Sequence, residues 1–170
     1  METLLFKQHQ ILTLLNEDVI LGLGNTSAWA SEANPPSVNT SITQQTELLG
    51  YIPVLTKQAV ARLSNPTEDT ITIKGGHYLP IPSTYEALDT NYCNSILVTG
   101  SLDHNSVVGN ANSYRSIGLY RDLKFSNGAT ISDPFIEYLD VVGMLVKLVY
   151  FSPQNLVADT TESISLVLSF

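Results

Sequence analysis

The second half of the chain consists of short apolar segments with the spacing of β-strands, and no other feature of the sequence constrains the fold as strongly. In the last of them, Ser163–Phe170, Ile164, Leu166 and Leu168 alternate with Ser and Val. Because successive side chains of a strand point to opposite sides, this spacing predicts a strand with one buried face. Three other such segments lie at 95–102, 114–120 and 143–151. The sequence therefore predicts a mostly β protein.

The first half mixes helical and strand patterns. Residues 3–16 contain no Gly or Pro, and their apolar residues follow helical spacing, which predicts an amphipathic helix. Residues 19–24 and 70–74 predict two strands, and residues 41–49 predict a short helix that Gly50 ends. The apolar face expected for the first helix consists of Leu4, Leu5, Ile11, Leu12 and Leu15.

Two segments are predicted to be loops, and the secondary structure of a third segment is left undecided. Residues 25–40 hold a Pro-Pro pair among many Ser, Thr and Asn residues, which excludes a helix. Residues 77–94 hold two further prolines and predict a turn-rich linker. Within residues 51–63, Pro53 argues against a central strand, and residues 59–63 fit either a strand or a helix.

These elements together predict an antiparallel, Greek-key-like β-sandwich with an N-terminal helix, one further short helix and long loops. A chain of 170 residues suits one domain of ordinary size. We expect a single β-sandwich domain, 1–170, in which residues 1–17 form an N-terminal helical segment and residues 64–94 a loop-rich insertion.

Composition and charge argue against several partners. The net charge is −8, and the 8 Lys and Arg residues are scattered, so no basic surface for a nucleic-acid backbone is expected. No apolar run reaches the roughly 18 residues of a membrane span, and the first residues lack the basic start of a signal peptide. A single cysteine, Cys93, is typical of a protein that folds in a reducing compartment. We therefore expect neither nucleic acid nor a membrane as a partner.

Charged residues are also sparse. They make up 14% of the chain, against about a quarter of a typical soluble domain. In their place stand 17 Ser, 16 Thr and 12 Asn residues. Such a surface forms hydrogen bonds with little desolvation of charge, which favours a protein that lies against other proteins.

No residue pattern indicates catalysis, a cofactor or a metal. Gly22 and Gly24 lie at the end of the strand predicted at 19–24. The dinucleotide fingerprint requires a third glycine and a following helix, so a turn at the strand end is the favoured interpretation. His9, His77 and His104 lie in separate segments without the spacing of metal ligands. The polar residues around His104 predict a turn after a strand, not a catalytic triad. We therefore predict no enzyme activity, no cofactor and no metal site.

The loop at 25–40 contains the only tryptophan, Trp29. An aromatic residue exposed on a loop is a common anchor of protein contacts. Alternatively, Trp29 folds back and covers the end of the sandwich, and the sequence leaves both interpretations open. Asn25, Pro35 and Pro36 lie in the same loop, and together with Trp29 they are the candidate partner contacts.

Two stretches at opposite ends of the chain resemble one family. Asp18–Trp29 has the pattern of a strand, a polar turn and a tryptophan, and the acidic, Pro-rich Glu32–Pro36 follows. Met144–Phe170 has the pattern of a strand, a Pro-containing turn and a closing strand, Thr-Glu-x-Ile-x-Leu-x-x-x-Phe. Both resemble the baseplate wedge subunit of T-even-type contractile-tailed bacteriophages, which is built on a Greek-key β-sandwich with long loops. The chain is much shorter, and Ser64–Asn94 replace a large central insertion of that family.

The resemblance implies a structural role in the virion, within a tail baseplate assembled in the host cytoplasm. Its implied partners are neighbouring baseplate wedge and tail proteins and a second copy of the chain, a homodimer. No catalytic residue is carried over, and Trp29 with its loop supplies the contact candidates. The alternative hypothesis is a small β-sandwich module of a tail fibre or adhesin that binds carbohydrate or a receptor, because Tyr78, Tyr85 and Tyr92 recur every seven residues.

Overall fold

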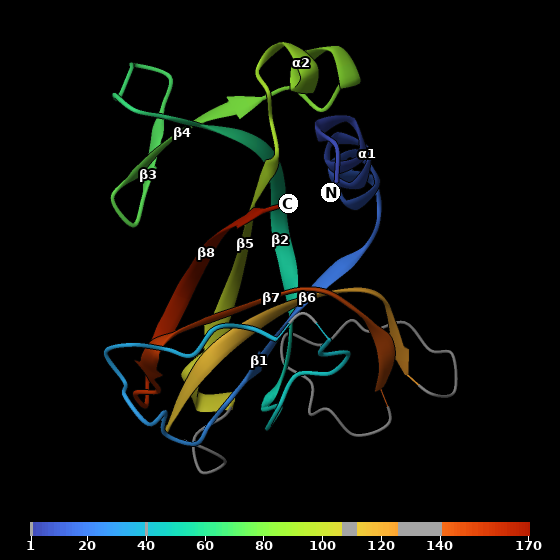
Figure 1. Cartoon of the computed structure of the whole chain (residues 1–170). Helices are drawn as coiled ribbons and strands as arrows, with labels where there is room; N and C mark the ends of the chain where they lie inside the picture. The colour runs from blue at the N-terminus through green and yellow to red at the C-terminus, as the bar shows by residue number, and fades with distance from the viewer. Residues whose placement is uncertain (1, 40, 107–111, 126–140) are drawn as a thin grey trace. The chain divides into compact units, whose positions relative to one another are not determined.

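A computed structural model describes residues 2–39, 41–106, 112–125 and 141–170 (Figure 1). The helices are α1 (Leu4–Asn16) and α2 (Tyr85–Thr90), with one short 3₁₀ turn at His104–Ser106. The strands are β1 (Val19–Gly24), β2 (Gly50–Leu63), β3 (Ile71–Ile73), β4 (Gly76–Ile81), β5 (Ser95–Asp103), β6 (Ser113–Phe125), β7 (Val141–Asn155) and β8 (Thr161–Ser169). The predicted fold class is confirmed: a mostly antiparallel, sandwich-like β fold with an N-terminal helix and one further short helix.

The chain divides into two compact units. We call Met1–Glu17, Leu55–Thr99 and Ile164–Phe170 the helical unit, and Asp18–Val54 and Gly100–Ser163 the loop unit. Strands β2, β5 and β8 each begin in one unit and end in the other. The expectation of a single domain with an insertion at 64–94 stays a prediction.

The sheet follows the order β3-β4-β2-β1-β6-β7, and β5 pairs with β2 and β8. The strands predicted at both ends of the chain are confirmed. β1 coincides with the predicted residues 19–24. In β8, the alternating residues Ile164, Leu166 and Leu168 are 5%, 6% and 1% exposed, as the one-face pattern requires.

Within the helical unit, α1 begins after Thr3, whose Oγ1 accepts a hydrogen bond from the Phe6 backbone N–H at 3.2 Å. The predicted helix is therefore confirmed, but its expected face is wrong in part. The fully buried residues are Gln8, Ile11 and Leu14, whereas Leu5 is 50% exposed. Leu5 precedes Leu14 by two and a half turns, so the two side chains leave opposite sides of the helix.

Proline was a misleading signal in two strands. Pro53 lies in β2 opposite Ile20, and Pro80 lies in β4 opposite Val60. The linker predicted at 77–94 contains most of β4 and all of α2, which corrects that prediction. Burial of the flanking apolar side chains favours the extended chain at both places and outweighs the missing N–H groups.

In the loop unit, the helix predicted at 41–49 is wrong. Gln45 is 7% exposed, and its Nε2 donates to the Gly22 carbonyl at 3.1 Å and to Ser116 Oγ at 2.7 Å. Its Oε1 accepts a hydrogen bond from the Tyr120 hydroxyl at 3.1 Å. Glu47 has a φ of 46°, which a right-handed helix does not allow. The segment is an irregular strap held on β1 and β6 by the buried Gln45 amide, together with backbone hydrogen bonds from Leu49 to Leu23 and from Asn25 to Thr46.

Glycines provide the space for this amide. A Cβ atom at Gly22 would lie 2.7 Å from Gln45 Oε1, and one at Gly118, the register partner of Gly22, would lie 2.8 Å from the same atom. Gly22 is therefore required inside a strand by the close approach of Gln45 and of the Tyr120 ring, whose Cε2 atom would also lie 2.7 Å from the Gly22 Cβ atom. This replaces the interpretation as a strand-end turn.

A double-mutant cycle tests this interpretation. Gly22→Ala should lower the free energy of unfolding by about 1–3 kcal/mol, because the added methyl group overpacks the site. In a Gln45→Ala background the same change should cost less, since the amide that it meets is gone. Urea unfolding of the four proteins measures both terms. Strictly additive effects would contradict the role given to Gly22.

Candidate partner-contact surface

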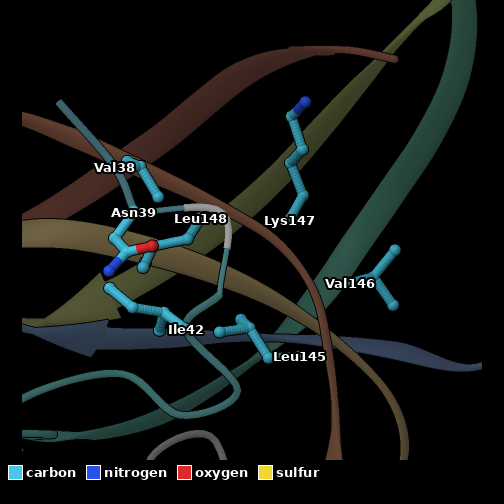
Figure 2. A pocket seen from close by; sticks show the side chains of 7 residues that line it. All are labelled: Val38, Asn39, Ile42, Leu145, Val146, Lys147 and Leu148. Atoms are coloured by element: carbon cyan, nitrogen blue, oxygen red, sulfur yellow. The ribbon is translucent and has the colours of Figure 1, made fainter. Parts of the chain in front are cut away.

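The segment that follows β1 lies beside β7 in the loop unit. Val38, Asn39 and Ile42 form one side of a groove of about 300 Å³, and residues Leu145–Leu148 of β7 form the other. Figure 2 shows Ile42 and Leu145 among the side chains that line it. Leu145 also packs on the buried cluster of Ile20, Tyr51 and Tyr120. Apolar side chains therefore make up most of the lining, and the Asn39 amide and the Lys147 side chain are its polar members.

β7 lies at the end of the strand order. Among the described residues it pairs with β6 only, so the other edge of β7 has no strand beside it. The β6–β7 register shifts at three places, one of them between Leu119 and Tyr120. Bulges of this kind twist an edge strand and disfavour the addition of a further strand. A partner is therefore expected to meet side chains here, not to extend the sheet.

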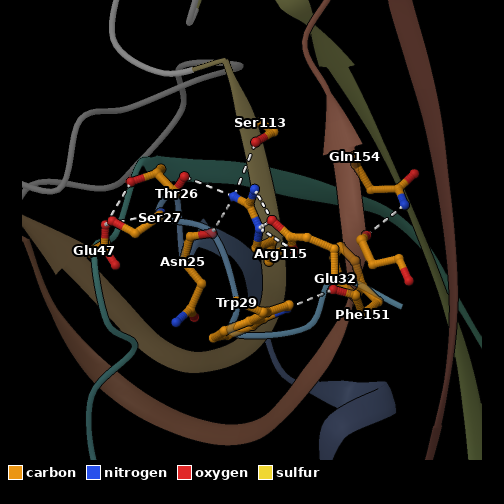
Figure 3. A network of polar contacts seen from close by, with 11 residues as sticks. Asn25, Thr26, Ser27, Trp29, Glu32, Glu47, Ser113, Arg115, Phe151 and Gln154 are labelled. Carbon is orange, nitrogen blue, oxygen red and sulfur yellow. Dashed lines mark hydrogen bonds and ion pairs between the residues drawn. The ribbon is translucent and has the colours of Figure 1, made fainter. Parts of the chain in front are cut away.

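Arg115 on β6 holds residues 25–39, which we call the anchored loop. Arg115 is 6% exposed, and its Nε donates to both carboxylate oxygens of Glu32, at 3.0 and 2.9 Å (Figure 3). Its Nη2 donates to Glu32 Oε1 at 2.6 Å, and its Nη1 donates to the Thr26 carbonyl at 2.8 Å. The planar guanidinium fits a carboxylate with parallel hydrogen bonds. One side chain thus fixes two separate points of the loop.

Glu47 fixes the start of the same loop. Its carboxylate accepts hydrogen bonds from the hydroxyl and backbone N–H of Ser27, the latter at 3.1 Å, and from Thr26 Oγ1 at 3.0 Å. The hydrogen bond from the Ser27 hydroxyl lowers the pKa of Glu47, and the hydrogen bonds from Arg115 lower the pKa of Glu32. Hydrogen bonding to Glu32 likewise raises the pKa of Arg115. The loop is therefore held by ionised carboxylates.

Trp29 folds back onto β7. Its Nε1 donates to the Phe151 carbonyl at 3.1 Å, and its ring centroid lies 5.1 Å from that of Tyr150. The side chain is half-buried, so part of the ring stays accessible. A contact between Trp29 and a partner remains a prediction.

The other three candidates lie at different depths. Asn25 is 5% exposed with a φ of 55°, so its side chain is covered. Pro35 is half-buried and Pro36 is exposed. The exposed apolar residues of the anchored loop are all small, Ala28, Ala30, Ala33 and Pro36, and its one charged residue, Glu32, is half-buried. We call the anchored loop, Ile42 and Leu145–Leu148 together the contact surface.

Sequence reasoning missed a buried polar cluster around His104. His104 is 5% exposed, and its Nδ1 accepts a hydrogen bond from the Val157 backbone N–H at 2.9 Å, so its Nε2–H donates to Glu162 at 3.0 Å. Tyr114 donates to the same Glu162 oxygen at 3.0 Å, and burial raises the pKa of Tyr114. His104 does lie in the predicted turn. Its partners are 53 and 58 residues away, so no local pattern could reveal them.

The structure also bears on three kinds of site considered from the sequence: a metal site, a membrane span and a sugar platform. No three described His, Cys, Asp or Glu side chains gather as a metal site requires. No described helix has the length and apolar character needed to span a membrane. The tyrosines considered as a sugar platform lie in β4 (Tyr78), at the start of α2 (Tyr85) and just after it (Tyr92).

Comparison with known families adds one match. Residues 7–170 match the model of the family described as "Baseplate wedge 3 tail fiber network component". No curated protein matches the chain.

Replacing the anchoring arginine should release the loop. Arg115→Lys keeps the charge but loses the parallel hydrogen bonds to Glu32, so Trp29 should leave β7 and become more exposed to water. Because Trp29 is the only tryptophan, a red shift of the intrinsic fluorescence reports this directly. Arg62→Lys, at an exposed position of β2, is the matched control and should leave the emission unchanged. Unchanged emission in Arg115→Lys would refute the anchor.

The loop should also be released by acid. The pKa values of Glu32 and Glu47 are lower in the docked loop than in free chain, so their stabilisation is complete above the ordinary pKa of a glutamate, about 4.3. It is lost as the pH falls from there through the lower pKa of the docked state. Trp29 emission should shift to the red over that range, and the shift should shrink in Glu32→Gln. If Glu32→Gln leaves the acid transition unaltered, groups other than Glu32 cause the transition.

Proposed function

The chain belongs to the baseplate wedge 3 tail fiber network component family, and from this premise we propose that it is a structural subunit that joins neighbouring proteins of a contractile phage tail. The membership confirms the resemblance to a phage baseplate wedge protein. The observation that carries the proposed role is the docking of the anchored loop by Arg115. A long loop without secondary structure is held in one conformation. Its one charged side chain is that of Glu32, which is partly exposed and paired with Arg115.

Such a surface suits a permanent contact. A loop that is ordered before binding loses little conformational entropy when a partner arrives. Apart from Glu32 and Lys147, the groups on the contact surface are apolar or uncharged, so most of it can be covered without desolvating charge. The groove beside β7, with Ile42 and Leu145 in its walls, offers a place for one apolar side chain of the partner. The contact surface thus combines a preformed shape with a low cost of burial.

The proposal extends to location and partners. We propose neighbouring wedge and tail-fibre proteins as the partners, with Trp29, Pro35 and Pro36 in the contact, and we keep a homodimer as a second expectation. The place of action would be the virion tail, after assembly in the host cytoplasm. The role is mechanical, and we expect neither enzyme activity nor a cofactor, nucleic acid or membrane to be involved.

A charge placed on the contact surface should block assembly. The chain is co-expressed with the products of its neighbouring tail genes, and the complexes are separated by size. Pro36→Glu should reduce co-assembly about tenfold or more, because a buried unpaired carboxylate is costly at an interface. Leu55→Glu, at a 64% exposed position of the helical unit, is the matched control.

Trp29 emission must stay unchanged in Pro36→Glu, which shows that the loop is still docked. Wild-type levels of assembly in Pro36→Glu would contradict the contact surface. The absence of any tail protein in the wild-type complex would contradict the proposed function itself.

A further inference from the structure

A second surface with unusual chemistry lies on the two helices of the helical unit. Leu5 and Phe6 of α1 are each 50% exposed, and Tyr85 of α2 is 43% exposed. The His9 ring stacks on the Tyr85 ring at 5.9 Å between centroids, with 22° between the planes. Leu5 and Phe6 lie one turn before His9, on neighbouring positions of the same helix. We call Leu5, Phe6, His9 and Tyr85 the helix patch.

The two helices are joined firmly beneath the patch. Gln8, which is fully buried, donates from its Nε2 to the Leu88 carbonyl at 3.3 Å. Leu88 is itself fully buried, and Thr84 caps α2 through a hydrogen bond from the Ala87 N–H at 3.2 Å. The patch is therefore presented by fixed elements, so its shape exists before any partner binds.

The fully exposed charged residues of α1 and α2, and of the residues just ahead of them, are acidic. Glu86 and Asp89 of α2 and Glu2 ahead of α1 are exposed, whereas Lys7 is half-buried. Asp89 follows Tyr85 by four residues and shares its side of α2. Tyr92, just after α2, is 77% exposed. An aromatic ring with a carboxylate beside it attracts a guanidinium group, which stacks on the ring and pairs with the acid.

We propose that the helix patch binds a partner segment that presents arginine among aliphatic side chains. The aliphatic groups cover Leu5 and Phe6, and the arginine lies over Tyr85 and pairs with Asp89. The patch shares no residue with the contact surface and lies in the other unit, so the inference stands without the function proposed above. With two separate surfaces, one chain can hold two different proteins.

The test uses the full chain and peptides of defined chemistry. A synthetic helical peptide of Leu, Ala and Arg, with Leu and Arg on neighbouring turns, is titrated into ¹⁵N-labelled protein, and a matched peptide carries Glu in place of Arg. The Arg peptide should shift the backbone amide signals of α1 and α2. Phe6→Ser and Tyr85→Ser should each weaken its binding about tenfold or more. Leu55→Ser, at a 64% exposed position of the same unit, should leave the affinity unchanged.

A charge swap sharpens the result. Asp89→Arg should weaken the binding of the Arg peptide and strengthen the binding of the Glu peptide. The proposal is overturned if both peptides bind wild-type protein equally, if no binding is seen at millimolar peptide, or if the shifted signals lie outside α1 and α2. Sedimentation that shows a dimer lost in Phe6→Ser would also overturn it, because a second copy would then occupy the patch.

Discussion

One buried arginine determines what the loop unit can present to a partner. The loop of residues 25–39 has the composition of flexible chain, with two prolines and many small polar residues. Arg115 overrides that tendency, since a buried guanidinium needs all its hydrogen bonds, and Glu32 and the Thr26 carbonyl supply most of them beside Ser113. The cost of leaving this charge partly unpaired favours the docked loop. Trp29 on β7 and the position of the groove follow from it.

Gln45 plays a comparable part for the next segment. Its amide is satisfied by β1 and β6 through Gly22, Ser116 and Tyr120, and glycines at 22 and 118 leave the necessary room. Two irregular segments are thus tied to the sheet by buried polar side chains, Arg115 and Gln45, with support from Glu47, Trp29 and backbone hydrogen bonds. This explains how a chain with few charges and long loops can offer a rigid surface. Rigidity, in turn, is what a structural subunit of a baseplate needs at its contacts.

The sequence predicted the elements whose signal is local. The alternation in Ser163–Phe170, the apolar segment at 19–24 and the N-terminal helix were all found where expected. Predictions failed where distant residues decide the structure. Residues 41–49 have helical propensity, but Gln45 forms hydrogen bonds with Gly22 and Ser116, which lie 23 and 71 positions away in the sequence. The Arg115–Glu32 pair spans 83 residues, so the loop could be named as a candidate contact while its anchor could not.

The central claim is that the anchored loop and the adjoining part of β7 form a contact between this chain and another protein of the baseplate. The most direct measurement is a cryo-EM reconstruction of a tail that contains the chain. The account predicts that a neighbouring subunit covers Pro36 and the groove formed by Ile42 and Leu145, with Glu32 still bonded to Arg115. A reconstruction in which this surface faces solvent, or in which the loop has left Arg115, would contradict the account.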